Sequence, residues 1–463
     1  MPPLNQGIAG LHWVRYGIAG DQKYLLGEFA ETYDQLVVNA NMVAHMPSAM
    51  SQFLSQQLKK QFVIDPQTHA FQHEVDSLLS DSKKSAGSLK RSWKRLVERY
   101  GAPLDSVIGS DEPRSLLPDD LADQALLEGF CKRVLLFQRD EITREIEEGE
   151  DADYIRFLAE QTGANSGNVP PAMLIAPYFF IGGPLQDDWL ELNRRCVDAS
   201  RKIVNADASA LPLAAQVVIS KELLSDNNLR AKVVKAFLDG KPDVILLWID
   251  GFSEQSASSA QLEHFVQFVT ELSQQNTPVI NLYGGFFSVS EARVGKLQDK
   301  LKGVCHGLEY GETKPVMPVA GGIPVAKFYS NHLHHRLPSR VAYNEVRALG
   351  GFQDVQHYHD IICGCQECKA VIKQNPQQDF RAYTESASKA IFRSGRRVAM
   401  EFPTAEAADH CTRHYMWCKA REYRDNLVLA NLKQRLLAAH ANLIKHVGSE
   451  FAAHAKLWSE VLQ

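Results

Sequence analysis

Hydrophobic and polar positions alternate along most of the chain in a pattern that predicts strands separated by helices. Short apolar segments rich in β-branched and aromatic residues are followed by longer amphipathic stretches, which is typical of a parallel sheet covered by helices. The clearest buried strand is 243–250, because no polar residue interrupts it between its two terminal aspartates. Eight segments are predicted to be strands: 34–41, 61–65, 171–180, 211–219, 243–250, 278–283, 304–309 and 326–330.

Eight strands that alternate with helices predict a (β/α)8 barrel of the TIM type. An open doubly wound sheet is the alternative fold, but no glycine-rich nucleotide-binding motif follows any predicted strand. Residues 75–168 are polar and helical, so we expect a helical insertion after the second strand. The expected organisation is a first part of the barrel at 1–74, the insertion at 75–168, the remainder of the barrel at 169–350, and a zinc-binding, helical C-terminal module at 351–463.

Composition and charge change this prediction little. The 463 residues are 45% hydrophobic and 23% charged, as in ordinary globular proteins, and the formal net charge of −5 gives no global basic field for nucleic acid. No signal-peptide pattern and no apolar stretch of membrane-spanning length are found, so we expect a cytoplasmic protein that does not cross a membrane.

Local basic clusters remain candidates for contacts with a polyanion. One lies on a predicted helix, for which a solvated helix face is the alternative interpretation, and the other lies near the C-terminal module. The clusters comprise Lys83, Lys84, Lys90, Arg91, Lys94, Arg95 and Arg99, and Arg393, Arg396 and Arg397.

The most specific chemical pattern is Cys-Gly-Cys-Gln-Glu-Cys at 363–368. Three thiols in one tight turn suit zinc, which in structural sites takes four Cys or His ligands in a tetrahedron. On a predicted helix, His410, His414 and Cys418 share one face; His414 is the preferred fourth ligand, and His410 and then Cys411 are the alternatives. Free cysteines packed as small hydrophobic residues are the other interpretation. The predicted ligands are Cys363, Cys365, Cys368 and His414.

Candidate catalytic residues lie at the carboxyl ends of the predicted strands, where a barrel carries its active site. Asp65 and Asp250 end two strands, and two carboxylates in one pocket can take different roles because their pKa values separate. A helix N-cap or a turn is the alternative role of each aspartate. Residues near other strand ends are candidates for substrate binding: Asn41, Gln67, Tyr283, Gly284, Gly307, Leu308 and His334.

Several segments of the chain, taken in their order along the sequence, resemble segments of the tRNA-guanine transglycosylase superfamily. Members of that superfamily are (β/α)8 barrels with a C-x-C-x-x-C…H zinc insertion. Residues 62–72 are similar to the family's strand ending in Asp-Ser-Gly-Gly-Phe-Gln, and 243–250 to the strand whose terminal Asp binds the guanine-like base. Residues 306–312 resemble Gly-Leu-Ala-Val-Gly-Glu, and 337–340 resemble Leu-Pro-Thr-Arg. The family's Phe-Asp-Cys nucleophile segment is replaced by Leu-His-His-Arg at 333–336. The chain is most similar to the DpdA branch, whose members exchange guanine in DNA for a 7-deazaguanine such as 7-cyano-7-deazaguanine (preQ0).

The resemblance implies a pentosyltransferase that works through a covalent aspartyl-glycosyl intermediate. Asp65 would be the nucleophile, or instead the general acid/base, and Asp250 would accept hydrogen bonds from the base. Tyr283 would stack on the base, and the backbone of Gly307 and Leu308 would contact its edge. Zinc would be structural, because four protein ligands leave no open position for water.

The implied partners are duplex DNA with a flipped base and a free 7-deazaguanine. The sequence does not decide whether an ATPase partner protein opens the duplex. A tRNA-guanine transglycosylase and a catalytically inactive, nucleic-acid-binding partner subunit are the alternative functions.

Overall fold

The computed structural model divides into two compact units, each discontinuous in the sequence. Unit 1 comprises Met1–Phe252, His264–Gly284 and Asp299–Pro318. Unit 2 comprises Ser253–Glu263, Gly285–Gln298 and Val319–Gln463. The structure describes residues 8–17, 19–58, 60–80, 87–149, 152–154, 157, 161, 170–207, 211–308, 311–317, 326–393 and 396–463.

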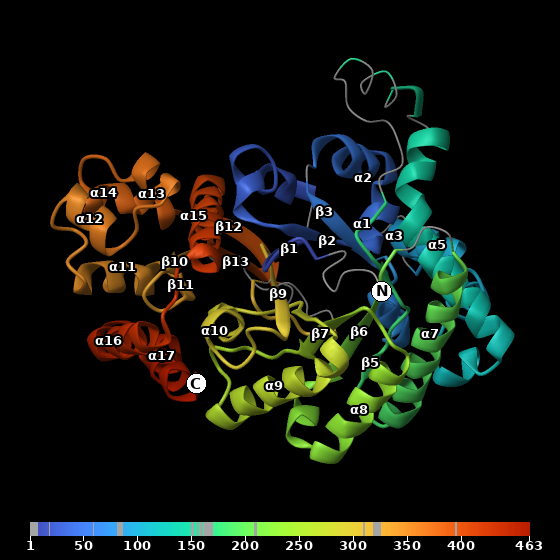
Figure 1. The fold of residues 1–463 in the computed structure, drawn as a ribbon. Helices are drawn as coiled ribbons and strands as arrows, with labels where there is room; N and C mark the ends of the chain where they lie inside the picture. The colour runs from blue at the N-terminus through green and yellow to red at the C-terminus, as the bar shows by residue number, and fades with distance from the viewer. Residues whose placement is uncertain are drawn as a thin grey trace. The chain divides into compact units, whose positions relative to one another are not determined.

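A curled sheet of parallel strands forms the centre of unit 1 (Figure 1). Its hydrogen-bonded order is β3-β2-β1-β9-β8-β7-β6-β4, and β5 also pairs with β6. β4 and β5 occupy the same position beside β6, so the sheet has eight strand positions. The strands are β1 (His12–Tyr16), β2 (Gln35–Asn39), β3 (Gln61–Asp65), β4 (Leu174–Ile175), β5 (Phe180–Ile181), β6 (Leu213–Ser220), β7 (Val244–Asp250), β8 (Val279–Asn281) and β9 (Leu301–Gly307).

The two ends of this sheet, β3 and β4, approach each other. The Ala172 N–H, two residues before β4, donates a hydrogen bond to the Phe62 carbonyl of β3 (2.7 Å). Among the described residues no β-ladder joins these two strands. The predicted α/β fold with a curled parallel sheet is therefore confirmed.

One predicted strand is not part of this sheet. Residues 326–330 contain β10 (Lys327–Ser330), which pairs antiparallel with β11 (His335–Pro338) in unit 2. The eighth position in the sheet is occupied by β1, between β2 and β9, which the sequence analysis missed because His12 and Arg15 interrupt its apolar pattern. Since β1 comes first, the strand at 61–65 that precedes the polar helical segment is the third strand, β3, and not the second as predicted.

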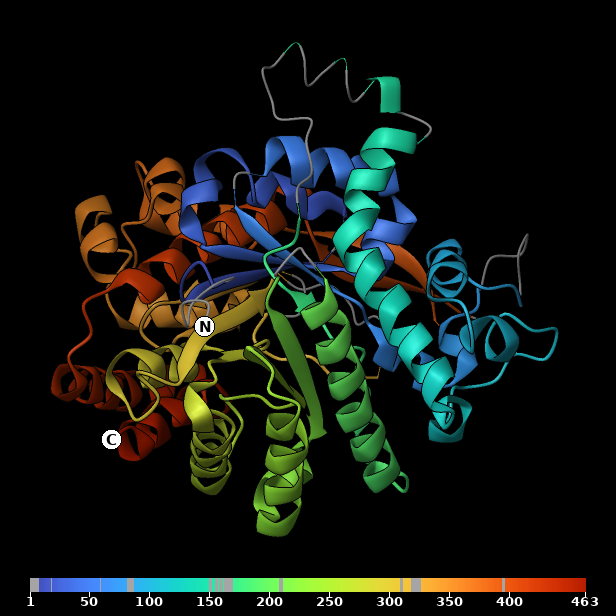
Figure 2. The same cartoon turned by 45° about the vertical axis from the view of Figure 1, so that its right-hand side comes forward.

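Helices lie against the outside of the sheet of unit 1, as α7 and α8 show in Figure 2. The starts of two helices follow from local sequence, because the carboxylates of Asp123 and Asp226 accept hydrogen bonds from the first backbone N–H groups of α5 and α8. The helices are α1 (Ala40–His45), α2 (Pro47–Gln52), α3 (Arg91–Tyr100), α4 (Leu104–Val107), α5 (Gln124–Glu148), α7 (Gln186–Ala206), α8 (Asn227–Asp239) and α9 (Ser259–Leu272), whose first residues belong to unit 2.

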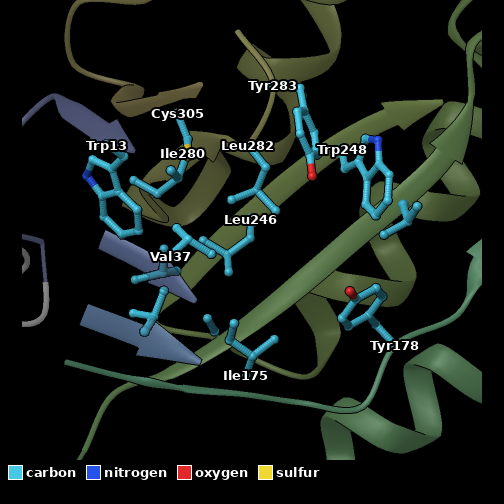
Figure 3. Close-up of a cluster of buried hydrophobic side chains, with 14 of the residues drawn as sticks. Trp13, Val37, Ile175, Tyr178, Leu246, Trp248, Ile280, Leu282, Tyr283 and Cys305 are labelled. Atoms are coloured by element: carbon cyan, nitrogen blue, oxygen red, sulfur yellow. The ribbon is translucent and has the colours of Figure 1, made fainter. Parts of the chain in front are cut away.

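The inner face of the sheet is filled by a hydrophobic core (Figure 3). Side chains along a strand alternate between its two faces. Every second residue of β1, β2, β7 and β8 therefore points to the inner face, where the hydrophobic ones are buried from water. These include Trp13, Val37, Leu246, Trp248 and Ile280. The core fills the inside of the curled sheet and leaves its strand ends for polar residues.

Unit 2 consists mostly of helices, with β10–β11 and a second antiparallel pair, β12 (Ser386–Arg393) and β13 (Arg396–Pro403). The expected helical character of the C-terminal module is confirmed in its last part, where three helices are separated by short breaks. The helices are α10 (Phe286–Val294), α11 (Ser339–Ala348), α12 (Val355–Ile361), α13 (Gln366–Val371), α14 (Pro376–Asp379), α15 (Ala405–Arg424), α16 (Leu429–Val447) and α17 (Ser449–Val461). In the described part of the chain, none of the helices has the length and apolarity that crossing a membrane requires.

Candidate active site and metal centre

Asp65, the predicted nucleophile, ends β3 on the inner face of the sheet, because Val63, two residues earlier, belongs to the core. Its carboxylate is almost completely buried. Oδ2 accepts a hydrogen bond from Arg15 Nη1 (2.9 Å). Oδ1 accepts one from the Tyr178 hydroxyl (2.6 Å) and one from the Gln67 backbone N–H (3.0 Å). Donors from three separate segments therefore fix this carboxylate.

Arg15 is a buried cation in this site, and the Lys314 ammonium lies 5.9 Å from the ring centre of Tyr283. Arg15 Nη1 also donates to Asn39 Oδ1 (2.6 Å), and the Arg15 guanidinium carbon lies 5.1 Å from the ring centre of Tyr283. Burial acts to raise the pKa of Asp65, but the positive charge of Arg15, helped by the Tyr178 hydrogen bond, outweighs it and holds that pKa below its usual value. At neutral pH Asp65 is therefore an ionised carboxylate, which a nucleophile requires.

Aromatic rings pack beside Asp65. The His69 ring stacks on Tyr178 with 5.2 Å between ring centroids and meets Trp248 edge-on at 5.1 Å. Tyr283 packs against the other side of this group, 5.1 Å from Trp248. Figure 3 shows Tyr178, Trp248 and Tyr283 together at one side of the core. Burial lowers the pKa of His69 to about 3, so its imidazole is neutral.

Several buried polar atoms of unit 1 lack a hydrogen-bond partner within the described part of the chain. Gln216 is notable, because it lies on β6 between two residues of the inner core and neither end of its amide is satisfied. Buried polar groups are normally paired, so unsatisfied donors and acceptors beside an aromatic cluster indicate a place for a polar, flat ligand. The atoms are Arg15 Nε and Nη2, Asn41 Oδ1, His69 Nδ1, and Gln216 Nε2 and Oε1.

Asp250, the second predicted catalytic residue, ends β7 and shares its inner face with Trp248. The alternation of side chains thus places it on the same face of the sheet as Asp65. Its Oδ1 accepts a hydrogen bond from the Val316 backbone N–H (2.7 Å), and the next N–H, of Gly251, donates to the Lys314 carbonyl (3.2 Å). Asp250 therefore anchors the segment around Val316 through one of its carboxylate oxygens.

The predicted substrate-binding residues of unit 1 have identified contacts. The Asn41 backbone N–H donates to Gln67 Oε1 (3.2 Å), which joins the ends of β2 and β3. The Gly284 N–H donates to the Cys305 carbonyl (3.0 Å), and the Gly307 N–H to the Gly311 carbonyl (2.7 Å). Leu308 is buried, whereas residues 309 and 310 of the predicted base-contacting segment lie outside the described residues.

His334, the remaining predicted substrate-binding residue, belongs to unit 2, in the turn between β10 and β11. Its backbone has φ = 49°, an uncommon conformation for a residue other than glycine. Its ring stacks on Phe286, and its Nδ1 is hydrogen-bonded to Glu422 (2.5 Å). His334 is thus part of a separate polar network within unit 2.

A group that could hold a metal ion also lies in unit 2. One ligand atom from each of Cys363, Cys365, His414 and Cys418 lies within 4.8 Å of all the others. His414 Nδ1 is 3.4 Å from the Cys365 sulfur and 3.5 Å from the Cys418 sulfur, and the Cys363 and Cys418 sulfurs are 3.8 Å apart. Zinc–ligand bonds of their usual length place tetrahedral ligands roughly 3.5–3.8 Å apart, so these residues fit zinc.

Neighbouring residues orient this group. His414 Nε2 is hydrogen-bonded to the Tyr329 carbonyl (2.9 Å), which leaves Nδ1 for a metal. The Cys368 sulfur lies 3.4 Å from His414 Nδ1 and also accepts a hydrogen bond from the Tyr383 hydroxyl (3.4 Å). His410, the alternative fourth ligand, is hydrogen-bonded through Nδ1 to Glu367 (2.6 Å).

The thiols of this group differ in acidity: burial raises the pKa of Cys418 well above its usual value, whereas the pKa of Cys363 is lowered. Hydrogen bonds from Cys365, Cys368 and Cys418 hold the pKa of the Cys363 thiol well below its usual value. A metal ion binds thiolates rather than thiols, so the lowered pKa of Cys363 favours metal binding at that residue.

The two predicted basic clusters differ in their surroundings. On α3, Arg95 Nη2 lies 3.3 Å from Glu141 and 3.2 Å from Glu145 of α5, and Arg99 also contacts Glu141 (3.5 Å). These arginines are therefore neutralised within unit 1; Lys83 and Lys84 lie outside the described residues.

In the second cluster, Arg396 and Arg397 are exposed on β13. Lys389, outside the predicted cluster, is exposed on β12, where it pairs with Met400 of β13. The side chain of Arg393 lies outside what the structure describes. Within the part of the chain that the structure describes, the side chains of Arg396, Arg397 and Lys389 form no ion pair with a carboxylate.

Several residues of both sites were not among those predicted from the sequence. Arg15 lies in the strand that was missed, and Tyr178, His69 and Gln216 act through contacts between distant segments. Cys418 had a sequence signal, because it follows His414 by one helical turn. Comparisons of the chain with models of protein families, with curated proteins and with solved structures found no match.

Proposed function

We propose that this protein is a transglycosylase that exchanges guanine in DNA for a 7-deazaguanine base. The observation that carries the proposal is the ionised Asp65 carboxylate, held by Arg15 and Tyr178 beside aromatic rings and unsatisfied polar atoms. A purine slot needs this combination of a flat apolar wall and hydrogen-bonding groups on its edge. The order of motifs shared with the tRNA-guanine transglycosylase superfamily, and above all with its DpdA branch, supports the same activity.

The reaction assigned to Asp65 consists of two displacements. A carboxylate oxygen bonds to C1′ of the deoxyribose while the bond from C1′ to the guanine nitrogen breaks, and guanine leaves with the electron pair and gains a proton. The incoming 7-deazaguanine then loses a proton, bonds to C1′ and displaces the carboxylate. The exchange retains the anomeric configuration and consumes no ATP.

Other residues bind the base in this proposal. Asp250 has a second carboxylate oxygen to accept hydrogen bonds from N1–H and the exocyclic amine, which favours guanine-like rings over adenine. Tyr283 stacks on the ring, and the backbone of Gly284, Gly307 and Leu308 contacts its edge. The proposal also includes closure of the eight strand positions into a (β/α)8 barrel, which the hydrogen bond between Ala172 and Phe62 supports.

The Cys/His group holds a structural zinc ion in this proposal. Zinc supplies a fixed tetrahedral crosslink between the turn at 363–368 and α15, and it takes no part in the exchange. DNA binds through the exposed cations of β12 and β13, for which no carboxylate partner comparable to Glu141 on α5 is found among the described residues. The target base leaves the duplex at a cost of a few kcal/mol, which phosphate contacts offset.

Radiolabelled guanine tests the proposal directly. The protein is incubated with label and either duplex DNA or tRNA, and label in the polymer is counted. Label in DNA is expected, and its incorporation should fall at least about a thousandfold in Asp65→Asn. Tyr178→Phe is the matched variant, because it removes one hydrogen bond to Asp65 and leaves the carboxylate, so it should retain measurable exchange.

The same assay separates the alternatives. Label in tRNA alone would assign the tRNA-guanine transglycosylase activity instead. Absence of label in both polymers, with circular dichroism and zinc content normal, would overturn the enzymatic proposal and leave the inactive, nucleic-acid-binding subunit.

A further inference from the structure

A cavity of about 490 Å³ lies within unit 2, and His334 is the one predicted substrate-binding residue in its lining. It is lined by the turn between β10 and β11, the end of α12 and the segment after it, and the helices α15 and α16. That segment includes Cys363, a residue of the metal group. Leu349, Leu436 and Leu443 give it an apolar wall, and its polar lining includes Arg421 and Arg435. Its volume lies in the range of cavities that bind small organic ligands.

One side of this cavity carries a buried network of ionisable groups. Glu422 is hydrogen-bonded to His334 Nδ1 (2.5 Å) and to the Tyr329 hydroxyl (2.6 Å), and it forms an ion pair with Lys419 (2.7 Å). All four side chains are buried. A buried charge network costs desolvation energy and His334 adds backbone strain, and such features are concentrated at functional sites.

The protonation of His334 follows from its contacts. Burial lowers the pKa of His334 although Glu422 acts to raise it, so the imidazole is neutral. Because Nδ1 donates its hydrogen to the Glu422 carboxylate, the other ring nitrogen, Nε2, carries a lone pair. His334 thus brings a hydrogen-bond acceptor to the cavity lining.

Two arginines from different helices reach the same cavity. Both Arg421 and Arg435 are exposed, and within the described chain neither guanidinium donates a hydrogen bond. Arg435 lies close enough to His332 and His334 to lower the pKa of each. Asp360 and Asp425 also line the cavity, and Asp360 accepts a hydrogen bond from Gln356 (2.8 Å).

We propose that this cavity binds a nucleotide, with the phosphate on Arg421 and Arg435. Guanidinium groups with unused donors match phosphate oxygens in geometry and charge. The apolar wall formed by Leu436 and Leu443 suits the face of the base or sugar, and His334 Nε2 accepts a hydrogen bond from a hydroxyl or amino group. The phosphate can belong to a free nucleotide or to one unit of a DNA strand.

The probe for this site is thymidine 5′-monophosphate, because a pyrimidine does not match a guanine-binding slot. Titration calorimetry on the zinc-loaded full chain should show binding, and thymidine without the phosphate should bind at least tenfold more weakly. Arg435→Gln and Arg421→Gln should each weaken binding of the monophosphate at least tenfold. Lys445→Gln, an exposed cation of α16 outside the cavity, is the matched control and should bind as the unaltered protein does.

Two further measurements identify the source of the phosphate and distinguish failure of this binding proposal from failure of the exchange proposal. If a ten-nucleotide thymidine strand displaces the monophosphate, the phosphate bound at this site belongs to DNA. If the strand does not compete, the site binds a free nucleotide. Asp65→Asn should bind the monophosphate normally even if no exchange is ever detected. Unchanged binding in both arginine variants, or no binding of the monophosphate, would overturn the proposal.

Discussion

The ion pair between Arg15 and Asp65 decides the chemistry available at the carboxyl end of β3. Burial this complete acts to raise the pKa of the Asp65 carboxyl, because desolvation disfavours its charged form. Arg15 reverses this preference, and Asn39 and Tyr283 hold the guanidinium in place. The same pair explains why Asp65 tolerates its apolar surroundings beside Trp248 and Tyr178.

Replacing Arg15 should therefore affect both stability and activity. Arg15→Met leaves a buried carboxylate without its partner, which should cost about 3–5 kcal/mol in the free energy of unfolding. Urea denaturation measures this loss. The folded-state pKa of Asp65 should rise, so the pH below which exchange activity is lost should also rise. Arg15→Lys keeps the charge and should show smaller changes in both quantities; equal losses in the two variants would argue against an electrostatic role.

The metal group offers five candidate ligand residues for four positions. Cys418 belongs to the compact set of four, whereas Cys368 also accepts a hydrogen bond from Tyr383. Atomic absorption should find about one zinc ion per chain. Cys418→Ser should lower this occupancy more than Cys368→Ser, because serine can still accept the tyrosine hydrogen bond. The opposite order would assign the metal to Cys363, Cys365, Cys368 and His414.

At the scale of secondary structure, the sequence predicted elements well where one face is strongly apolar and poorly where it is not. β7 was predicted almost to the residue, because both of its faces are buried. β1 was missed because His12 and Arg15 are polar although both are buried: His12 is hydrogen-bonded to His306, and Arg15 to Asp65. Pairing partners that lie far away in the sequence cannot be read from a local pattern.

The same reasoning explains the error at β10. Residues 327–330 have the composition of a buried strand, but their hydrogen-bonding partner is β11, only five residues further along the chain, and the two form a hairpin.

In the candidate site, too, local sequence predicts some residues and tertiary contacts add the others. Asp65 and Asp250 were predictable as strand-end carboxylates, whereas Arg15 and Tyr178 enter the site only through tertiary contacts.

The ribbon of β12 and β13 should contribute most of the salt dependence of DNA binding. Each phosphate contact releases counterions and adds about 0.9 to the slope of log affinity against log salt concentration. Arg396→Gln with Arg397→Gln should therefore reduce the slope measured by fluorescence anisotropy by about 2. Arg91→Gln with Lys94→Gln on α3 is the matched double variant. A larger reduction there than in the ribbon would place the DNA on α3.

At the scale of the whole molecule, both units contain histidines that are buried as neutral groups. Burial lowers the pKa of His69 to about 3 and that of His73 to about 4 in unit 1. In unit 2, burial lowers the pKa of His454 to about 3. An unfolded chain binds protons at these positions below pH 6.5, whereas the folded units do not. Each histidine therefore contributes stability that is complete above pH 6.5 and is lost as the pH falls towards 3–4.

This linkage predicts that both units lose stability in mildly acidic solution, before the carboxylate of Asp65 titrates. Lowering the pH from 7.5 to 5.5 should reduce the free energy of unfolding by about 1.4 kcal/mol for each of these histidines. Urea denaturation at several pH values measures the loss in each unit. His69→Asn should flatten the pH dependence by one such contribution, whereas His446→Asn, an exposed residue of α16, should leave it unchanged. A free energy that stays constant between pH 7.5 and 5.5 would show that these histidines are accessible to protons in the folded protein.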